Sequence, residues 1–176
     1  GKQIKQIENL VNEFSDFARM PKPILKDNNL VLLINDSINL INELDNKILI
    51  NLNKSAGDVI LNSDSEQLSR VFFNLIKNSI ESIHDKKLTN VNFTGKIDIT
   101  LNNNASNIDF IIIDNGLGFG LFEDNVKDIL NPYFTTKEKG TGLGLAIVNK
   151  IINDHHGSIN FIPIENGAKI HIRFIK

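Results

Sequence analysis

Two pairs of apolar segments, each pair joined by a short polar turn, constrain the fold of this chain more than any other feature. The segments "KIDITL" and "NIDFIII" flank the turn "NNNAS", and "SINFIPI" and "AKIHIRFI" flank the turn "ENG". Apolar strands on both sides of a turn-forming stretch predict β-hairpins. Hairpins belong to antiparallel or mixed sheets, whose helices commonly cover one face only. We therefore expect an α+β fold, in which a mixed sheet and a layer of helices form a two-layer α/β sandwich.

The periodicity of apolar residues predicts where the helical layer comes from. The expected helices cover residues 30–44, 64 to about 83, a short stretch near 123–130, and about 143 to 157. Asp64 and Gln67 have the spacing of a capping box, and Gly157 is a typical residue for a helix C-cap. Residues 48–53 and 58–63 are short strand candidates on either side of the turn "KSAGD".

A separate helix is expected at residues 3–19. Its apolar residues recur at steps of three and four, as in the seam of a helical bundle. They are Ile4, Ile7, Val11, Phe14 and Ala18, with Leu10 and Phe17 widening the stripe. The following "RMPKP" ends the helix in a stiff connection, which favours half of a helical hairpin over a helix lying on its own domain. The chain then divides into residues 1–20, a linker at 21–29 and a domain at 30–176.

Charge and composition exclude several classes of function. The net charge of −2 gives no overall basic field for nucleic acid or an anionic membrane, so any phosphate site has to be local. Because the chain has no cysteine, it has no disulfide, catalytic thiolate or cysteine-ligated zinc. No apolar run approaches the ~18 residues of a membrane span. The chain begins within an expected helix, which leaves room for membrane segments upstream.

The helix that starts at Asp64 separates an apolar side from a polar side at ~100° per residue. The apolar side collects Leu68, Val71, Phe72, Leu75, Ile76, Ser79 and Ile83, and the polar side collects Gln67, Arg70, Asn74, Lys77, Asn78 and Glu81. Asn74 and Asn78 are four residues apart and project together. Their amides, with Lys77, could hold a hydrated magnesium ion and neutralise phosphate oxygens. The alternative is an ordinary solvated helix face.

A carboxylate ends the most apolar strand of the chain. The run "FIIID" stops at Asp114, which Gly116 and Gly118 follow closely. Asp-Asn-Gly is in itself a turn signal. A carboxylate at the end of a central strand can also accept a hydrogen bond from an adenine amino group, while the two glycines let the base lie against the backbone.

Three alternating glycines, Gly140, Gly142 and Gly144, lead into the last expected helix from a lid-like region at 116–141. They match neither the dinucleotide fingerprint, which follows a strand, nor the Walker loop, which needs Gly-Lys-Ser/Thr. Amides at a helix N-terminus and the helix dipole can receive a phosphate. A structural turn needs fewer glycines, and Lys137 lies close by in the sequence, so we favour a phosphate contact.

Taken in order, these pieces resemble the ATP-binding domain of bacterial sensor histidine kinases, of the GHKL or Bergerat superfamily. "QLSRVFFNLIKNSIESI" is similar to the N box, "DNGLGF" to the first glycine box, "PYFTTK" to the F box and "GTGLGLAIV" to the second glycine box. The motifs lie between residues 67 and 148, and the resemblance extends from Leu30 to Lys176. The lead-in "EFSDFARMP" is most similar to nitrogen-regulation sensors of the NtrY/NtrB type.

The resemblance implies that the chain binds ATP and Mg²⁺. Asn78 and Asn74 would hold the metal, Asp114 would read adenine, and Lys77 and Lys137 would contact phosphates. The whole implied cofactor-binding set is Asn74, Lys77, Asn78, Asp114, Gly116, Gly118, Thr136, Lys137, Gly140, Thr141, Gly142, Leu143, Gly144 and Leu145.

In such kinases the γ-phosphoryl group passes from ATP to a histidine on a homodimeric dimerisation and phosphotransfer domain, and then to an aspartate of a response regulator. Residues 1–20 would be the C-terminal part of the second helix of that domain. The first helix, with the acceptor histidine, is absent. His84, His155, His156 and His171 lack the acceptor's sequence setting, so this chain should bind ATP without phosphorylating itself. The domain would be cytoplasmic, within a protein that upstream segments could anchor in the inner membrane, and no nucleic-acid partner is expected.

Two positions depart from relatives. Superfamily hydrolases place a glutamate one turn before the magnesium asparagine, where this chain has the neutral Asn74, so hydrolysis should be slow. Lys169 falls where relatives often have a threonine near the adenine. Three alternatives stay open: a non-catalytic nucleotide-dependent interaction module, a GHKL ATPase, and a serine kinase of the anti-sigma-factor type.

Overall fold

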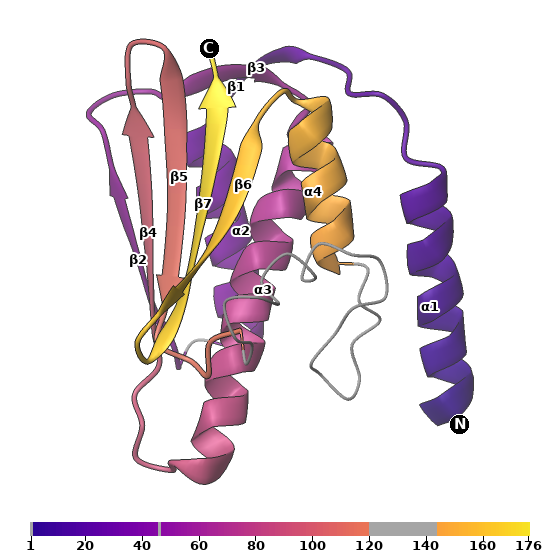
Figure 1. Cartoon of the computed structure of the whole chain (residues 1–176), viewed down its shortest axis with the longest axis vertical. Helices are drawn as coiled ribbons and strands as arrows, with labels where there is room; N and C mark the ends of the chain where they lie inside the picture. Colours follow the sequence, from indigo (N-terminus) through magenta and orange to yellow (C-terminus); the bar gives the residue numbers. More distant parts are fainter. Residues whose placement is uncertain (1, 46, 120–143) are drawn as a thin grey trace.

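A five-stranded sheet with helices on one face forms the body of this computed structural model, which describes residues 2–45, 47–119 and 144–176 (Figure 1). The elements along the chain are α1 (Lys2–Ala18), β1 (Lys26–Asn29), α2 (Leu30–Leu44), β2 (Leu49–Lys54), β3 (Ile60–Ser63), α3 (Ser65–Thr89), β4 (Lys96–Asn103), β5 (Asn107–Asp114), α4 (Gly144–Asp154), β6 (Ser158–Ile164) and β7 (Gly167–Ile175). The strand order is β2-β4-β5-β7-β6. Only β2 and β4 pair in parallel, so the sheet is mixed, as predicted.

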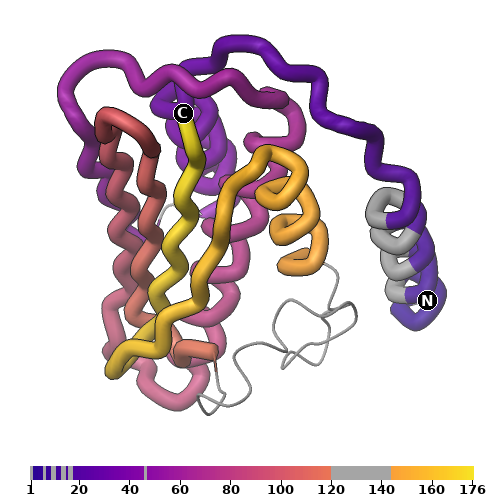
Figure 2. The backbone as a smooth tube through the Cα atoms, turned by 45° about the horizontal axis from the view of Figure 1, so that its top comes forward, coloured from indigo at the N-terminus to yellow at the C-terminus, as the bar shows by residue number. Residues whose placement is uncertain are grey.

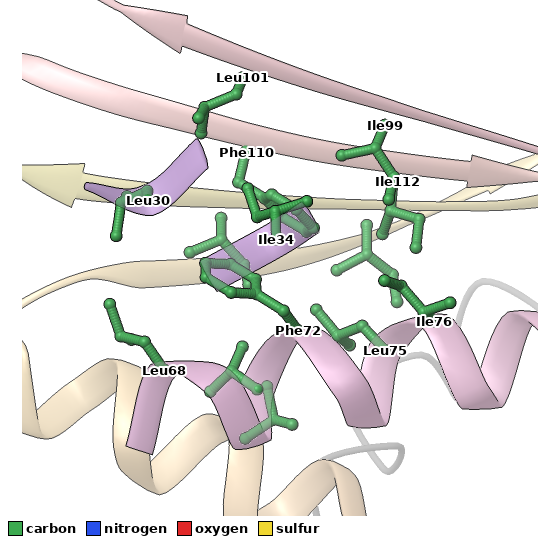
Figure 3. Close-up of a cluster of buried hydrophobic side chains, with 14 of the residues drawn as sticks. Leu30, Ile34, Leu68, Phe72, Leu75, Ile76, Ile99, Leu101, Phe110 and Ile112 are labelled. Carbon is green, nitrogen blue, oxygen red and sulfur yellow. The ribbon is translucent and has the colours of Figure 1, made fainter. Parts of the chain in front are cut away.

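Both predicted hairpins are confirmed, because β4 pairs antiparallel with β5 and β6 pairs antiparallel with β7. Alternate residues of each strand point to opposite faces of a sheet. The side chains that face the helices are buried, and they meet α2 and α3 in the core (Figure 3). Phe72 of α3 and Phe110 of β5 lie at the centre of this layer, with ring centroids 5.0 Å apart. The two-layer α/β sandwich is therefore confirmed (Figure 1).

One strand was not predicted. β1, with the sequence KDNN, lies in the segment expected to be a linker, and it pairs antiparallel with β3 in a separate two-stranded sheet. The sequence does not predict β1, because its polar residues have low strand propensity. The strand forms by pairing with β3, which lies far along the chain. The strand candidates on either side of "KSAGD" both exist, but they lie in different sheets and do not pair with each other.

The helix ends differ from expectation in two places. α3 continues past Ile83 to Thr89. The prediction stopped too early because the last turns of the helix are polar and show no apolar periodicity. At the end of α4 the residue with positive φ is His156, at 60°, and not the expected Gly157. The Gly157 amide donates to the carbonyl of Ile152 at 2.9 Å, which closes a Schellman motif one residue beyond the left-handed position.

The helix expected at residues 3–19 is confirmed as α1, which stands apart from the sheet and its covering helices (Figures 1 and 2). Ile4, Ile7 and Val11 are 62%, 61% and 55% exposed. The side chains of Leu10, Phe14 and Phe17 lie outside what the structure describes, as does the short helix expected near 123–130. In the described part of the chain, no helix is both long and apolar enough to span a membrane.

Candidate functional site

The first turn of α3 is held by a cap that the sequence predicted in part. Asp64 accepts a hydrogen bond from the Gln67 amide at 3.0 Å. The capping box is not completed, because the Asp64 amide donates to His155 Nε2 at 3.1 Å and not to the Gln67 side-chain oxygen. The Gln67 side-chain nitrogen donates to the carbonyl of Pro21 at 3.0 Å. Gln67 is only 8% exposed, so its assignment to the polar face was wrong. The N-terminus of α3 is thus tied to the chain that leads in from α1.

The amide face of α3 lies where the periodicity placed it. All seven residues of the predicted apolar side are buried. Asn74 and Asn78 are half-buried and Lys77 is exposed, so two carboxamides and one ammonium group project from one side of the helix. Asn78 makes an interaction within the chain.

Asp114 ends β5 as a buried acid. Its side chain is on the sheet face that packs against the helices, and the residue is 6% exposed. The carboxylate Oδ1 accepts a hydrogen bond from the Gly116 amide at 2.9 Å. Burying a carboxylate lowers the stability of the fold unless polar groups hydrogen-bond to it. Its burial at the end of a strand therefore needs polar partners, of which the Gly116 amide is one.

Gly116 brings this turn directly against α3. A Cβ atom at Gly116 would lie 2.8 Å from the carbonyl carbon of Ser82 and 2.9 Å from the amide of Ile83, so only glycine allows the backbones to approach this closely. Ser82 is four residues after Asn78 and lies on nearly the same side of α3. The end of β5 therefore lies beside the middle turns of α3, which carry Asn74 and Asn78 (Figure 1).

Position 118 also requires glycine, because its backbone is in the left-handed region. Its φ is +81°, and an added Cβ would lie 2.8 Å from the carbonyl oxygen of Gly167. Both predicted glycines thus have a backbone role beside the acid. Phe119 follows at once, and its ring meets that of Phe161 edge to face, with centroids 5.7 Å apart.

Three residues that pattern reading missed hold the Asp-Asn-Gly turn. Asn115 accepts a hydrogen bond from the Lys96 amide at 2.8 Å and donates to the carbonyl of Thr94 at 3.0 Å. Its own carbonyl accepts from the Lys86 ammonium group at 2.9 Å. Ser82 accepts from the amide of Leu117 at 2.9 Å. The sequence held no signal for these contacts beyond the turn itself, because the partners are distant along the chain.

Lys169 does not lie beside Asp114. In the register of β5 and β7 it opposes Ile113, while Ala168 opposes Asp114. Since neighbouring residues of a strand face opposite sides of the sheet, Lys169 faces away from the helices. In this structure Ala168, and not Lys169, lies opposite Asp114.

Part of the implied set lies outside the described residues, namely Thr136, Lys137, Gly140, Thr141, Gly142 and Leu143. Gly144 and Leu145 are described, and they form the half-buried start of α4. A Cβ added to Gly144 would meet none of the described residues within 4 Å.

Three of the four histidines contact other residues and His156 is exposed, in line with the expectation that each is structural or solvated. His84 contacts Asp45 at 2.6 Å, and it lies within α3, not at its end. His171 contacts Asp109 at 2.8 Å on the sheet face away from the helices. His155 is buried between α3 and α4.

A cluster of charged side chains around Asp109 also lies away from Asp114. Asp109 is 7% exposed, and it accepts hydrogen bonds from Arg173 Nε at 2.8 Å and from Asn104 Nδ2 at 3.0 Å. The Arg173 guanidinium, opposed by burial and supported by His171, holds the pKa of Asp109 below its usual value. In residues 2–45, 47–119 and 144–176, no group of three or more His, Cys, Asp or Glu residues could hold a metal ion.

The residues at the α3 and β5 end fit a nucleotide with a hydrated metal. A buried carboxylate can take a base amino group, and Gly116 and Gly118 let the backbone beside it pack closely on Ser82 and Gly167 with no side chain in between. Magnesium keeps most of its waters and needs few protein oxygens, so two carboxamide oxygens beside a triphosphate can serve as its protein ligands.

Known proteins share this sequence and fold. Residues 63–176 match the family model described as histidine kinase-, DNA gyrase B- and HSP90-like ATPase. An NtrY-like sensor histidine kinase of Rickettsia felis is 34% identical over 169 residues, which is 96% of this chain and 27% of that protein. The nitrogen regulation protein NtrY of Azorhizobium caulinodans is 34% identical over 173 residues, or 97% of this chain and 22% of the relative. The chain thus spans about a quarter of these relatives.

Solved structures agree with the sequence relatives. The catalytic domain of histidine kinase ThkA, free of nucleotide, has a TM-score of 0.74 at 29% identity and covers 86% of this chain and 95% of its own. ThkA in complex with the response regulator TrrA has a TM-score of 0.80 at 25% identity and covers 99% of this chain and 48% of its own. The chain belongs to the family of histidine kinase-, DNA gyrase B- and HSP90-like ATPases, and it carries the ATP-binding domain of a sensor histidine kinase.

Proposed function

We propose that this chain binds Mg²⁺-ATP between the amide face of α3 and the start of α4, with the base at Asp114. In the intact protein, the γ-phosphoryl group would pass to a histidine of the dimerisation domain and then to a response-regulator aspartate. The observation that carries the proposal is the packing of Gly116 on Ser82, because it joins the buried acid of β5 to the asparagine face of α3.

Asp114 would select adenine. An ionised carboxylate only accepts hydrogen bonds, and the adenine amino group is a donor. Since Asp114 Oδ1 already accepts from the Gly116 amide, the carboxylate has a defined orientation before the base arrives. Gly116 and Gly118 would line the base with backbone and no side chain.

The triphosphate would lie between α3 and α4. Asn78 and Asn74 would hold the metal ion and Lys77 would approach the phosphate oxygens from the same helix face. Gly144 and Leu145 at the start of α4 would offer amides and the positive end of the helix dipole. Bound magnesium would neutralise charge on the phosphate oxygens. The remaining proposed contacts, which lie outside the described residues, are Thr136, Lys137, Gly140, Thr141, Gly142 and Leu143.

A kinase is favoured over a hydrolase by the side chain at Asn74. A neutral carboxamide cannot take a proton from water, so bound ATP would keep its γ-phosphoryl group until an imidazole arrives. Positioning and charge neutralisation would supply most of the acceleration.

The exposed apolar stripe of α1 supports a second helix as its partner. Ile4, Ile7 and Val11 recur at helical spacing and are more than half exposed. We propose that α1 is the end of the second helix of a homodimeric hairpin, with the domain from Leu30 onward as the ATP-binding unit. ThkA, which was solved with the response regulator TrrA, supports a response regulator as the later partner.

Labelled ATP tests the proposal. The chain itself should bind Mg²⁺-ATP, with slow phosphate release and without becoming labelled. A longer form that includes the upstream helix should gain an acid-labile, base-stable label on histidine. Binding without any label in the longer form would favour the interaction module, and steady phosphate release would favour an ATPase.

A further inference from the structure

The geometry points to Ser82 and Lys86 as positioning residues that set the preference for adenine, by clamping the turn from Asp114 to Gly118 onto the last turns of α3. This inference rests on the proposed function, because it assumes that Asp114 reads the base. Neither residue would touch the nucleotide. Each acts on the backbone that follows the acid.

Asn115 is the centre of the clamp. Its side chain bridges the amide of Lys96 at 2.8 Å and the carbonyl of Thr94 at 3.0 Å, so it is fixed to the start of β4 and to the loop before it. Its amide donates to the carbonyl of Lys96 at 3.3 Å. These bonds extend the β4–β5 ladder one residue past Asp114.

Lys86 joins this turn to α3. Its ammonium group donates to the carbonyl of Asn115 at 2.9 Å and lies 4.4 Å from the centroid of the Phe93 ring. The side chain is half-buried, so part of its water shell is replaced by these two contacts. A hydrogen bond from a charged donor is stronger than one from a neutral donor.

Ser82 holds the turn from its other end. Its hydroxyl accepts from the Leu117 amide at 2.9 Å, and Gly116 packs against its backbone. Gly116 in turn donates to Asp114 Oδ1 at 2.9 Å. The orientation of the carboxylate therefore depends on where Gly116 stands, and Ser82 and Lys86 determine that position from both sides.

If the turn from Asp114 to Gly118 is less ordered before binding, the affinity for adenine nucleotides should fall. If Asp114 must be ordered on binding, the bond to the 6-amino group weakens, because the ordering opposes it. A nucleotide without that group never uses the bond, so its affinity should not depend on the clamp. The discriminating quantity is the ratio of affinities for ATP and purine riboside triphosphate, which lacks the amino group.

The test compares Lys86→Met and Ser82→Ala with the wild-type chain. Methionine keeps an apolar stem over Phe93 and removes the donor, and alanine removes only the hydroxyl. Lys87→Met and Ser69→Ala, also on α3, are the matched controls. Calorimetry with Mg²⁺ gives both affinities, and thermal melting checks that each variant is folded.

We expect the wild-type chain to prefer ATP, and each clamp variant to lose about two- to fivefold of that preference, within the range of one net hydrogen bond. A fall in the ratio for either variant, with both controls unchanged, supports the inference. An unchanged ratio in both variants overturns it, even if both affinities drop together, and leaves the proposed function standing. A wild-type chain that does not bind ATP, or shows no preference for it, overturns the proposed function and this inference with it.

Discussion

The imidazole of His155 joins the end of α4 to the start of α3, because its Nε2 accepts a hydrogen bond from the backbone amide of Asp64 at 3.1 Å. Its Nδ1 contacts the carbonyl of Ile151 at 2.7 Å. A backbone amide only donates and a carbonyl only accepts, so the partners define a neutral ring with the proton on Nδ1. The N-cap of α3 and the C-terminus of α4 are thereby held together.

Replacing His155 by leucine should lower the free energy of unfolding by about 1–3 kcal/mol, because the amide of Asp64 loses its acceptor in a partly buried place. Urea unfolding measures the difference. His155→Gln, whose side-chain oxygen can accept from the same amide, should recover part of the loss. Equal stability of the leucine variant and the wild type would contradict the structural role of this histidine.

Replacing the neighbouring histidine, His156, should stabilise the chain. His156 has a φ of 60°, a left-handed conformation that glycine adopts without strain. His156→Gly should therefore raise the free energy of unfolding by about 0.5–1 kcal/mol. A glycine variant less stable than the wild type would show that the exposed ring contributes more than its backbone strain costs.

Gly116→Ala should destabilise the chain by about 1–3 kcal/mol, since the added methyl group has to displace the backbone of α3. Gly144→Ala is the matched control. At that position no atom in the described part of the chain lies within 4 Å of the added methyl group, and alanine is the better helix former. Thermal unfolding of the two variants side by side decides whether close approach, and not glycine loss in general, is the cause.

Acid should weaken the fold through Asp109. The Arg173 guanidinium, against the effect of burial and together with His171, lowers the pKa of Asp109 from its ordinary value of 3.8. The stability that this carboxylate provides is fully present above the ordinary pKa, and it is lost as the pH falls through the lower pKa of the folded state. Asp109→Asn should therefore be less stable than the wild type near neutral pH, with a difference that shrinks in acid. A difference in the free energy of unfolding between the two proteins that is the same at every pH would count against this.

Metal and base should be separable by two variants at the candidate site. Asn78→Ala should abolish the gain in ATP affinity that Mg²⁺ provides and leave the melting temperature nearly unchanged. Asp114→Ala should weaken ATP binding by about 1–3 kcal/mol with and without the metal, the cost of an unpaired buried partner. Calorimetric titrations in both conditions measure this. Identical metal dependence in Asn78→Ala and the wild type would remove Asn78 from the metal site.

Local pattern was enough for several elements. The helix at residues 30–44 has the predicted bounds, since an apolar stripe fills it and Asn29 caps it through a bond to the amide of Val31 at 3.1 Å. The apolar side of α3 is buried as predicted. These features depend on neighbours a few residues away, which a sequence shows directly.

The polar face of α3 and the acid at Asp114 were also predicted separately, each with its structural alternative. What pattern could not show is that the turn after Asp114 packs on α3 one turn beyond Asn78. The contact depends on Gly116 reaching the backbone of Ser82, and no periodicity records a contact between such distant segments.

The order of residues by itself determined where the described long helices begin, the two hairpins and the chemistry of the candidate side chains, because each arises from spacing within one short segment. Only the tertiary structure decided that β2 runs parallel to β4, that β1 pairs with β3, and that Lys169 faces away from Asp114. Those outcomes depend on how distant segments share one core, where burying apolar surface and pairing backbone groups select a single arrangement.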